Sequence, residues 1–315
     1  MRSPDRCLWL LPLCATLALA IAGGCAAPTA SPGTTPTGAF PVTVRDALGN
    51  QVTVRAAPQR IVSLAPAMTE ILFALGLRKR IVGVTEYCDY PAAARSKPRI
   101  GGIVNPSVER ILAHKPDLVL GMRLNPKPVL RTISKAGIPV YAAEPRSIDE
   151  VLATIGTLGT LTDERESAAR LVDGLRERLQ TVRRKTRGLS QPTAMLLYSE
   201  DPLWVAGADS FPDHAIRLAG GRNAANDVKG YKHYSVEMLL ARDPEAIFLT
   251  SMESGNDADR LRRFTTRPSM RSLSAVKHHR VYVINADIVD RAAPRIVQGV
   301  EQIAACLHPQ AFTSH

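Results

Sequence analysis

The sequence contains few cysteines and no apolar run long enough to cross a membrane. Its five cysteines are too few for the disulfide framework of a small secreted domain. The longest apolar run, Leu8–Ala22, has about 15 residues, whereas a membrane-spanning helix needs roughly 20. The 315 residues, 45% hydrophobic and 22% charged, therefore favour a globular chain with a sizeable core, and two domains are the first expectation.

Motifs of several enzyme classes are also missing. The chain has no Gly-x-Ser-x-Gly, no Walker-type Gly-x-x-x-x-Gly-Lys and no Gly-x-Gly-x-x-Gly after a strand. The run Gly220-Gly221-Arg222-Asn223 follows an expected helix and is typical of a C-cap and turn. We expect a protein without enzymatic activity and without a catalytic cofactor, and an enzyme is the rival class.

The seven histidines show no spacing typical of metal ligands. His278 and His279 are expected to alternate across the approach to a strand, so both rings could hardly point into one site. We expect no dedicated metal site. A metal-ion-binding lipoprotein stays an alternative, and His233 or His278 could still ligate the metal of a bound cofactor.

Basic residues exceed acidic ones, with a net charge of +11 and a pI near 9.7. They are spread along the chain apart from one cluster at Arg183, Arg184, Lys185 and Arg187, and no nucleic-acid-binding motif accompanies that cluster. We expect no nucleic-acid partner. The cluster is interpreted as a solvated helix face or as a region attracted to anionic lipid headgroups.

The N-terminus has the organisation of an export signal. Arg2 and Arg6 precede the apolar run, and Gly23-Gly24-Cys25 resembles the site at which lipoproteins are cleaved and acylated, although Ala22 stands where leucine is usual. We expect a signal peptide over residues 1–24 and a lipidated Cys25, which holds an exported protein on the outer side of a membrane. An ordinary secretory signal is the alternative.

Removal of that signal leaves two cysteines besides Cys25. Cys88 and Cys306 could form a bridge or stay as two partly buried thiols, and the sequence does not decide between these.

The segment after Cys25 is built from Ala, Pro, Thr, Ser and Gly, and it is expected to be a flexible tether over residues 25–39. Two alternating runs, 42–46 and 51–55, surround Leu48-Gly49-Asn50 and predict a β-hairpin. Strands and helices then alternate, which is typical of an α/β fold. The expected strands are 61–64, 81–84, 118–120, 140–142, 194–198, 246–249 and 281–285; the expected helices are 69–75, 108–114, 128–136, 211–218 and 236–241.

A helical stretch divides this pattern into two halves. Periodicity over 148–187 breaks near Leu161-Thr162-Asp163, where Thr162 or Asp163 could cap a second helix. That helix, from about Glu164 to Arg187, would be about 35 Å long. We therefore expect two α/β lobes, 40–147 and 191–315, linked by helices over 148–190 that include one long helix.

One helix-strand unit occurs twice. SVERILAHKPDLVL, residues 107–120, aligns with SVEMLLARDPEAIF, residues 235–248. Each copy predicts a serine that caps a helix, a helix that begins with Val-Glu and ends before a proline, and then a buried strand. Glu109 and Glu237 could simply stabilise the helix starts. As a pair on two lobes, they could instead present two carboxylates to a partner with two matching arginine sites.

The runs RIVSLAPAMTEILFALGLRKRIVGVTEYCDYPAAA, KPRIGGIVNPSVERILAHKPDLVLG, WVAGADSFPDHAIRLAGGRN and DRAAPRIVQGVEQIA resemble the cobalamin, haem and ferric-siderophore binding proteins of ABC importers. TEYCDYP and the SVE helix starts are most similar to the cobalamin-binding members. The resemblance implies a monomer that delivers a small molecule to a permease dimer with cytoplasmic ATPases, and it implies that Glu109 and Glu237 bind arginines of that permease.

The resemblance also implies that the two lobes are Rossmann-like, with central sheets and a ligand cleft between them. The residues that match the lining of this cleft are Ala65, Pro66, Tyr87, Asp89, Ile103, Trp204, Tyr231, Asp287, Asp290 and Arg291. Cobalamin binders place large aromatic residues where this chain has Ile103 and Tyr231; Tyr231 keeps a flat surface for stacking and Ile103 does not. Tyr87, Trp204 and Tyr231 could supply the aromatic faces that a bulky ligand needs. We expect cobalamin or another corrinoid as the ligand, with haem or a ferric siderophore as alternatives.

Overall fold

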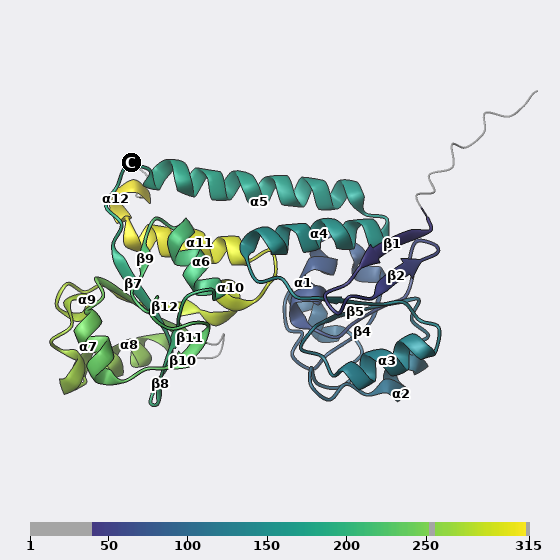
Figure 1. The fold of residues 1–315 in the computed structure, drawn as a ribbon, viewed down its shortest axis with the longest axis horizontal. Helices are drawn as coiled ribbons and strands as arrows, with labels where there is room; N and C mark the ends of the chain where they lie inside the picture. The colour runs from purple at the N-terminus through teal and green to yellow at the C-terminus, as the bar shows by residue number, and fades with distance from the viewer. Residues whose placement is uncertain (1–39, 252–255, 313–315) are drawn as a thin grey trace, which may run out of the picture. The chain divides into compact units, whose positions relative to one another are not determined.

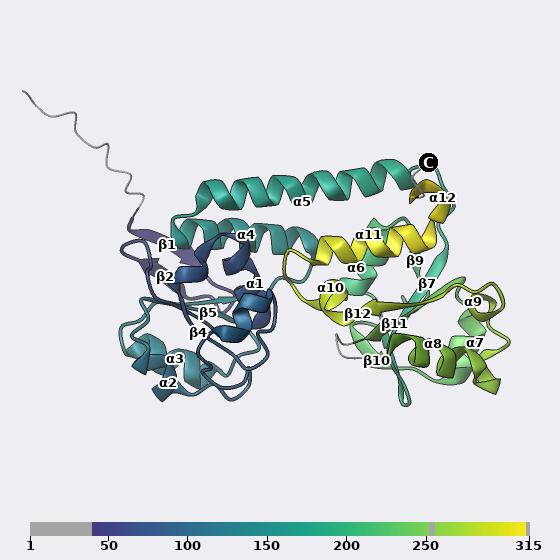
Figure 2. The same ribbon diagram turned by 180° about the vertical axis from the view of Figure 1, so that it is seen from behind.

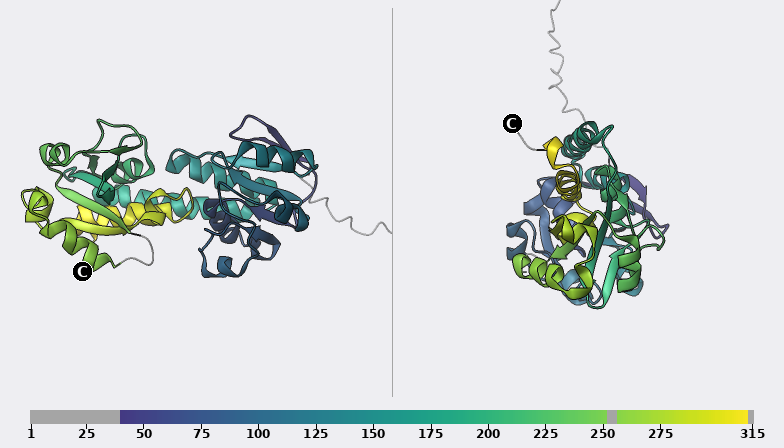
Figure 3. Two further views of the ribbon diagram at one scale, coloured as in Figure 1. Left: turned by 90° about the horizontal axis from the view of Figure 1, so that it is seen from below. Right: turned by 90° about the vertical axis from the view of Figure 1, so that its left-hand side faces the viewer.

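The computed structural model describes residues 40–251 and 256–312. The signal peptide expected over 1–24, the lipidation of Cys25 and the tether over 25–39 lie outside these residues. Besides one hairpin, the described strands form two separate sheets (Figures 1 and 3). We call the part from β1 to β6 the first lobe and the part from β7 to α12 the second lobe. In the described ranges, no helix is both long and apolar enough to cross a membrane.

The first lobe is a parallel four-stranded sheet, in the order β4-β3-β5-β6, with the expected hairpin β1–β2 beside it. Helix α1 begins three residues before the predicted Thr69, because Pro66 fits the first turn of a helix. The elements are β1 (Val42–Arg45), β2 (Gln51–Val54), β3 (Ile61–Ser63), α1 (Pro66–Ala74), β4 (Ile81–Val84), α2 (Val108–Ala113), β5 (Leu118–Met122), α3 (Lys127–Lys135) and β6 (Val140–Ala143), with 3-10 helices η1 (Leu77–Arg80) and η2 (Ala92–Ser96).

Both faces of this sheet are buried. Ile61 and Leu118 belong to a core shared with α1, whereas their neighbours Val62 and Val119 belong to a second core shared with α2 and α3. A strand that is covered on both faces needs an apolar residue at every position. That requirement explains why these strands are continuous apolar runs in the sequence.

Helices α4 (Ile148–Thr162) and α5 (Arg165–Thr186) connect the lobes. The 22 residues of α5 rise about 33 Å, close to the predicted length. The expected cap was wrong: Asp163 ends α4 in the left-handed conformation (φ 64°), and α5 begins after Glu164 without a side-chain cap. The tight turn between the two helices requires a left-handed residue, which aspartate tolerates.

The second lobe has a mixed sheet, in the order β10-β8-β7-β11-β12, in which β8 and β10 are antiparallel additions that the sequence pattern missed. The expected strands near 194, 246 and 281 form its parallel part. The elements are β7 (Thr193–Glu200), β8 (Leu203–Ala206), α6 (Phe211–Leu218), β9 (Arg222–Asn223), β10 (Tyr231–His233), α7 (Val236–Arg242), β11 (Ala246–Ser251), α8 (Asp257–Thr266), η3 (Pro268–Met270), α9 (Ser274–Lys277), β12 (Val281–Asn285), α10 (Ala286–Asp290), α11 (Ile296–Leu307) and α12 (Pro309–Phe312).

One apolar core runs through both lobes and the connecting helices. It includes Leu120 of the first sheet, Leu175 and Leu179 of α5, and Phe248 of the second sheet. A bidentate ion pair between Arg178 of α5 and Glu301 of α11, at 2.8 and 2.6 Å, adds to this attachment. Helix α5 is therefore packed against the body of the protein along its buried face, as Figures 1 and 2 show.

Candidate functional site

Exposed aromatic and apolar side chains gather at the carboxyl ends of the strands of the first lobe. Tyr87 and Tyr90 follow β4, Val104 lies in the loop before α2, and Leu124 follows β5. Tyr87 is 59% exposed and Leu124 is 59% exposed. Large apolar side chains that stay in water mark binding surfaces, and the carboxyl ends of parallel strands are where α/β sheets bind ligands.

The second lobe presents a matching pair of aromatic residues on its two antiparallel strands. Trp204 of β8 and Tyr231 of β10 are 40% and 41% exposed. Trp204 lies opposite His233 in the register of the two strands, and their rings meet edge to face at 6.3 Å. The short strands that sequence patterns missed thus hold the aromatic surface of this lobe.

A pocket of about 540 Å³ lies between the lobes, and Leu124 and Tyr231 are the members of the two surfaces that line it. Met122, Leu124 and Ala143 line it from the first lobe, and Phe211 and Tyr231 line it from the second. A larger pocket of about 1110 Å³ lies at the amino ends of β5 and β6 beside β2, where no exposed aromatic residue lines it. The interlobe pocket is therefore the candidate ligand site.

A cluster of phenols and a carboxylate lies on the second-lobe side. The Tyr231 hydroxyl donates a hydrogen bond to Asp290, and the Tyr198 ring meets the Tyr231 ring edge to face at 5.1 Å. Within the described ranges, the hydroxyl of Tyr198 is buried without a hydrogen-bond partner. Burial and the nearby Asp290 carboxylate raise the pKa of both tyrosines, and burial raises the pKa of Asp290. Both phenols are therefore neutral at physiological pH.

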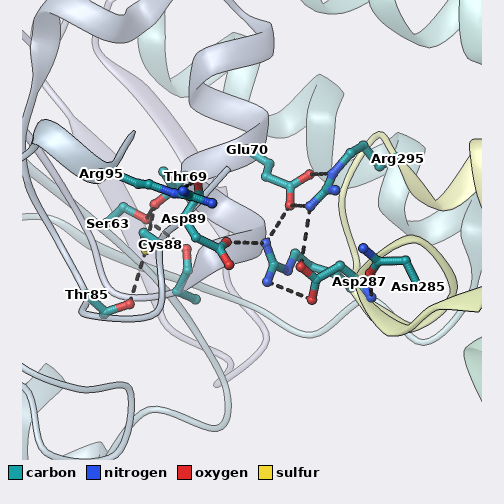
Figure 4. Close-up of polar contacts among 12 residues, drawn as sticks. Ser63, Thr69, Glu70, Thr85, Cys88, Asp89, Arg95, Asn285, Asp287 and Arg295 are labelled. Atoms are coloured by element: carbon teal, nitrogen blue, oxygen red, sulfur yellow. Dashed lines mark hydrogen bonds and ion pairs between the residues drawn. The ribbon is translucent and has the colours of Figure 1, made fainter. Parts of the chain in front are cut away.

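Five charged side chains connect the two lobes beside this cluster (Figure 4). Glu70 of α1 is bonded by Arg291 and Arg295 of the second lobe at 2.8 and 2.7 Å. Arg291 also contacts Asp89 of the first lobe at 3.1 Å and Asp287 of its own lobe at 2.8 Å. Burial lowers the pKa of both arginines, but their carboxylate partners outweigh it, so the net shift is upward.

Asn125 fixes the loops at the strand ends. Its buried side-chain amide donates to the backbone oxygens of Leu64 and Ile103 at 3.0 and 2.9 Å, and its oxygen accepts from the backbone N–H of Met122 at 2.7 Å. One side chain therefore ties together the ends of β3 and β5 and the loop before α2. Sequence patterns gave no signal for this residue.

The repeated helix starts are present in both lobes. Ser107 and Ser235 cap α2 and α7, accepting from the backbone N–H three residues on at 3.2 and 3.1 Å. Glu109 and Glu237 follow them, and both are exposed. Hydrogen bonds from its own backbone N–H and from the hydroxyl of Ser235 lower the pKa of Glu237. Helices α2 and α7 lie on the side of the protein opposite α5 (Figures 1 and 2).

The described cysteines do not form a disulfide, and the described histidines do not form a metal site. Cys88 and Cys306 are free thiols, which answers the question the sequence left open. His278 ends α9 and His279 lies in a turn (φ 56°), so the expected strand alternation was wrong here. In residues 40–251 and 256–312, no group of three His, Cys, Asp or Glu side chains could hold a metal ion.

Comparison with known proteins assigns the chain to a family. The model of the family described as periplasmic binding protein matches residues 61–288. The chain belongs to this periplasmic binding protein family. An uncharacterized ABC transporter substrate-binding lipoprotein of Bacillus subtilis is 31% identical over 313 residues, which cover 97% of this chain and 98% of that one.

Solved members of the family have the same fold. The periplasmic vitamin B12-binding protein of Vibrio cholerae aligns with a TM-score of 0.70 and 29% identity, covering 82% of this chain and 99% of that one. A periplasmic haem-binding protein of Roseiflexus aligns with a TM-score of 0.71 and 27% identity, covering 80% and 99%. The resemblance read from the sequence and the two-lobed α/β fold are confirmed.

The ten residues predicted to line the cleft have different surroundings in this periplasmic binding protein. Tyr87, Trp204 and Tyr231 are exposed, whereas Ala65 is buried in the core beneath the strand ends. Pro66 and Ile103 are partly buried at these strand ends. Asp290 is bonded to Tyr231. Asp89, Asp287 and Arg291 are joined in the ion pairs between the lobes, together with Glu70 and Arg295, which the sequence did not single out.

Proposed function

We propose that this protein is the substrate-binding component of an ABC importer and that it carries cobalamin or a related corrinoid in the interlobe pocket. Family membership supports the transport role. The observation that favours a broad flat ligand is the pair of exposed aromatic surfaces, Tyr87 on one lobe and Trp204 with Tyr231 on the other. Aromatic faces bury large areas of a ligand at little entropic cost.

A second ligand class is favoured by the oxygen cluster on the second lobe. Tyr198, Tyr231 and Asp290 place two phenols and a carboxylate together at the pocket. Carboxylate oxygens suit hard cations, and tyrosine ligates haem iron in some proteins, although either phenol here would first have to give up its proton. Haem and ferric siderophores are therefore the alternative ligands.

The chain offers a built-in reporter for the binding test. Its two tryptophans are Trp9 and Trp204, so the form lacking residues 1–25 keeps only Trp204, on the aromatic surface of the second lobe. We expect cobalamin to quench this fluorescence saturably at one ligand per protein, with cobinamide, haem and a ferric hydroxamate as competitors. Tyr87→Ala is expected to weaken the binding measured by calorimetry. Met238→Ala, which shortens an exposed apolar side chain on α7 instead, should leave binding unchanged.

Binding of haem or ferric hydroxamate in preference to cobalamin would assign the ligand to the alternative class. No saturable binding by any of the four would contradict the proposed function.

The exposed glutamates are proposed as the contacts with the permease dimer, which in turn works with cytoplasmic ATPases. Glu109 and Glu237 start equivalent helices on one side of the protein, and neither has an ion-pair partner among the described residues. We expect Glu109→Lys with Glu237→Lys to abolish uptake and to spare ligand binding, because two arginine partners would then face positive charge. Glu166→Lys, on the exposed face of α5, is the matched control. Normal uptake by the double variant would refute the docking role.

The remaining expectations from the sequence complete the proposal. We propose that residues 1–24 are a signal peptide, that Cys25 is acylated and that 25–39 tether the protein to the outer side of a membrane. We further propose that the monomer has lobes over 40–147 and 191–315, with linking helices over 148–190.

A further inference from the structure

The carboxylate of Glu70 is buried, and both of its oxygens are bonded from the other lobe. Its side chain is 2% exposed, on the largely apolar helix α1. Arg295 forms a fork with it through Nε at 3.0 Å and Nη2 at 2.7 Å, and Arg291 adds a third bond at 2.8 Å. Its partners lie 221 and 225 residues further along the chain. A buried carboxylate needs such partners to stay charged.

Each arginine holds a second group of the first lobe. Arg291 reaches Asp89 at 3.1 Å, and the guanidinium of Arg295 stacks over the Tyr90 ring at 3.6 Å from its centre. Asp287 of the second lobe forms ion pairs with both arginines, at 2.8 Å to Arg291 and 3.6 Å to Arg295, and these favour their orientation. We call Glu70, Asp89, Asp287, Arg291 and Arg295 the latch (Figure 4).

The latch shares its two segments with the proposed ligand surfaces. Asp89 lies in the loop that carries Tyr87, and Arg291 follows Asp290, which is bonded to Tyr231. A change in the position of the latch therefore moves both aromatic surfaces. Because hydrogen bonds weaken steeply with distance, a small separation of the lobes breaks several of these contacts together and leaves charges without partners.

We infer that Glu70 is a positioning residue: through the latch it sets the separation of the lobes, and with it the width of the pocket, before any ligand binds. The effect on ligand binding rests on the proposed function, whereas the effect on the separation of the lobes does not. Preformed pockets bind more tightly because closure does not have to be driven by the ligand. Release of the ligand to a permease then requires the contacts of the latch to be broken. The permease would separate the two lobes through the positions at which it docks to them.

The distance between the lobes tests the inference without any ligand. Spin labels at Arg131→Cys on α3 and Lys277→Cys on α9 report it by pulsed electron resonance, in the form lacking residues 1–25 with Cys306→Ser; Cys88 is fully buried. We expect one narrow distance distribution. Glu70→Gln should broaden it and add longer distances. Arg295→Lys keeps the charge but loses the fork, and it should give an intermediate result.

Glu301→Gln is the matched control, because it removes the same kind of contact, a bidentate carboxylate–arginine pair. This pair joins Glu301 of α11 to Arg178 of α5, away from the pocket. It should leave the distances unchanged. For a ligand that binds, Glu70→Gln should raise the dissociation rate about tenfold and Glu301→Gln should not. Folded Glu70→Gln and Arg295→Lys proteins with the original distance distribution would overturn the inference. Failure of ligand binding alone would refute only the proposed function.

Discussion

Two glycine-to-alanine substitutions in helices should change stability in opposite directions. Alanine stabilises a helix interior over glycine by about 0.8–1.0 kcal/mol. Gly174 of α5 has nothing within 4 Å of an added Cβ, so Gly174→Ala should gain this amount. At Gly299 of α11, the same Cβ would overlap the carbonyl oxygen of Ile288 and lie 2.9 Å from its carbon.

The clash at Gly299 involves backbone, which cannot rotate away as a side chain can. Overpacking of this kind costs about 1–3 kcal/mol, which is larger than the gain in helix propensity. Gly299→Ala should therefore be less stable than Gly174→Ala by about 1–3 kcal/mol. Each kcal/mol of this difference should lower the Tm by roughly 2–4 °C. Asp287 of the latch lies in α10 and Arg295 directly precedes α11, so a separation of these two helices should loosen the latch.

Urea and thermal denaturation of the form lacking residues 1–25 measure both effects. A gain in stability for Gly174→Ala would show that the higher helix propensity of alanine takes effect in this protein. Equal stability of the two variants would refute the close approach of α10 and α11.

Two further predictions concern titrating groups. Burial raises the pKa of the Cys306 thiol to about 11, so alkylation at pH 8 should be about 100-fold slower than for an ordinary cysteine; a rate typical of a free thiol would contradict this burial. Burial also raises the pKa of Asp290 in the folded state, so stability from this group is lost as pH rises from about 4 through that raised pKa. Asp290→Asn should remove this loss and gain stability relative to wild type as the pH rises above about 4; unfolding curves with the same pH dependence for both proteins would refute it.

Local patterns predicted much of the fold. The alternation in 42–46 and 51–55 predicted the hairpin, and the two SVE runs predicted the capped helices α2 and α7, because hairpins and caps depend on neighbouring residues. Strand β10 has three exposed residues and no alternation of burial, so the pattern contained no signal for it. Its position depends on pairing with β8.

The site was less accessible to sequence reasoning than the fold. The sequence shows Glu70 only as one acid in an apolar helix, and nothing nearby indicates arginines more than 200 residues away. Asp287 and Arg291 were selected as cleft residues, and their ion pair with each other joins residues four positions apart. The ion pairs of Arg291 with Glu70 and Asp89 depend instead on how the lobes are packed. Such contacts between distant segments follow from tertiary structure and not from local spacing.

The central claim is that one ligand is held between both lobes. Hydrogen–deuterium exchange with saturating cobalamin, haem or ferric hydroxamate tests it most directly, because it reports each lobe separately. The account predicts protection of the 85–91 loop in the first lobe together with β8 and β10 in the second, while α2 and α7 exchange as before. Protection confined to one lobe, or no change with any of these ligands, would contradict it.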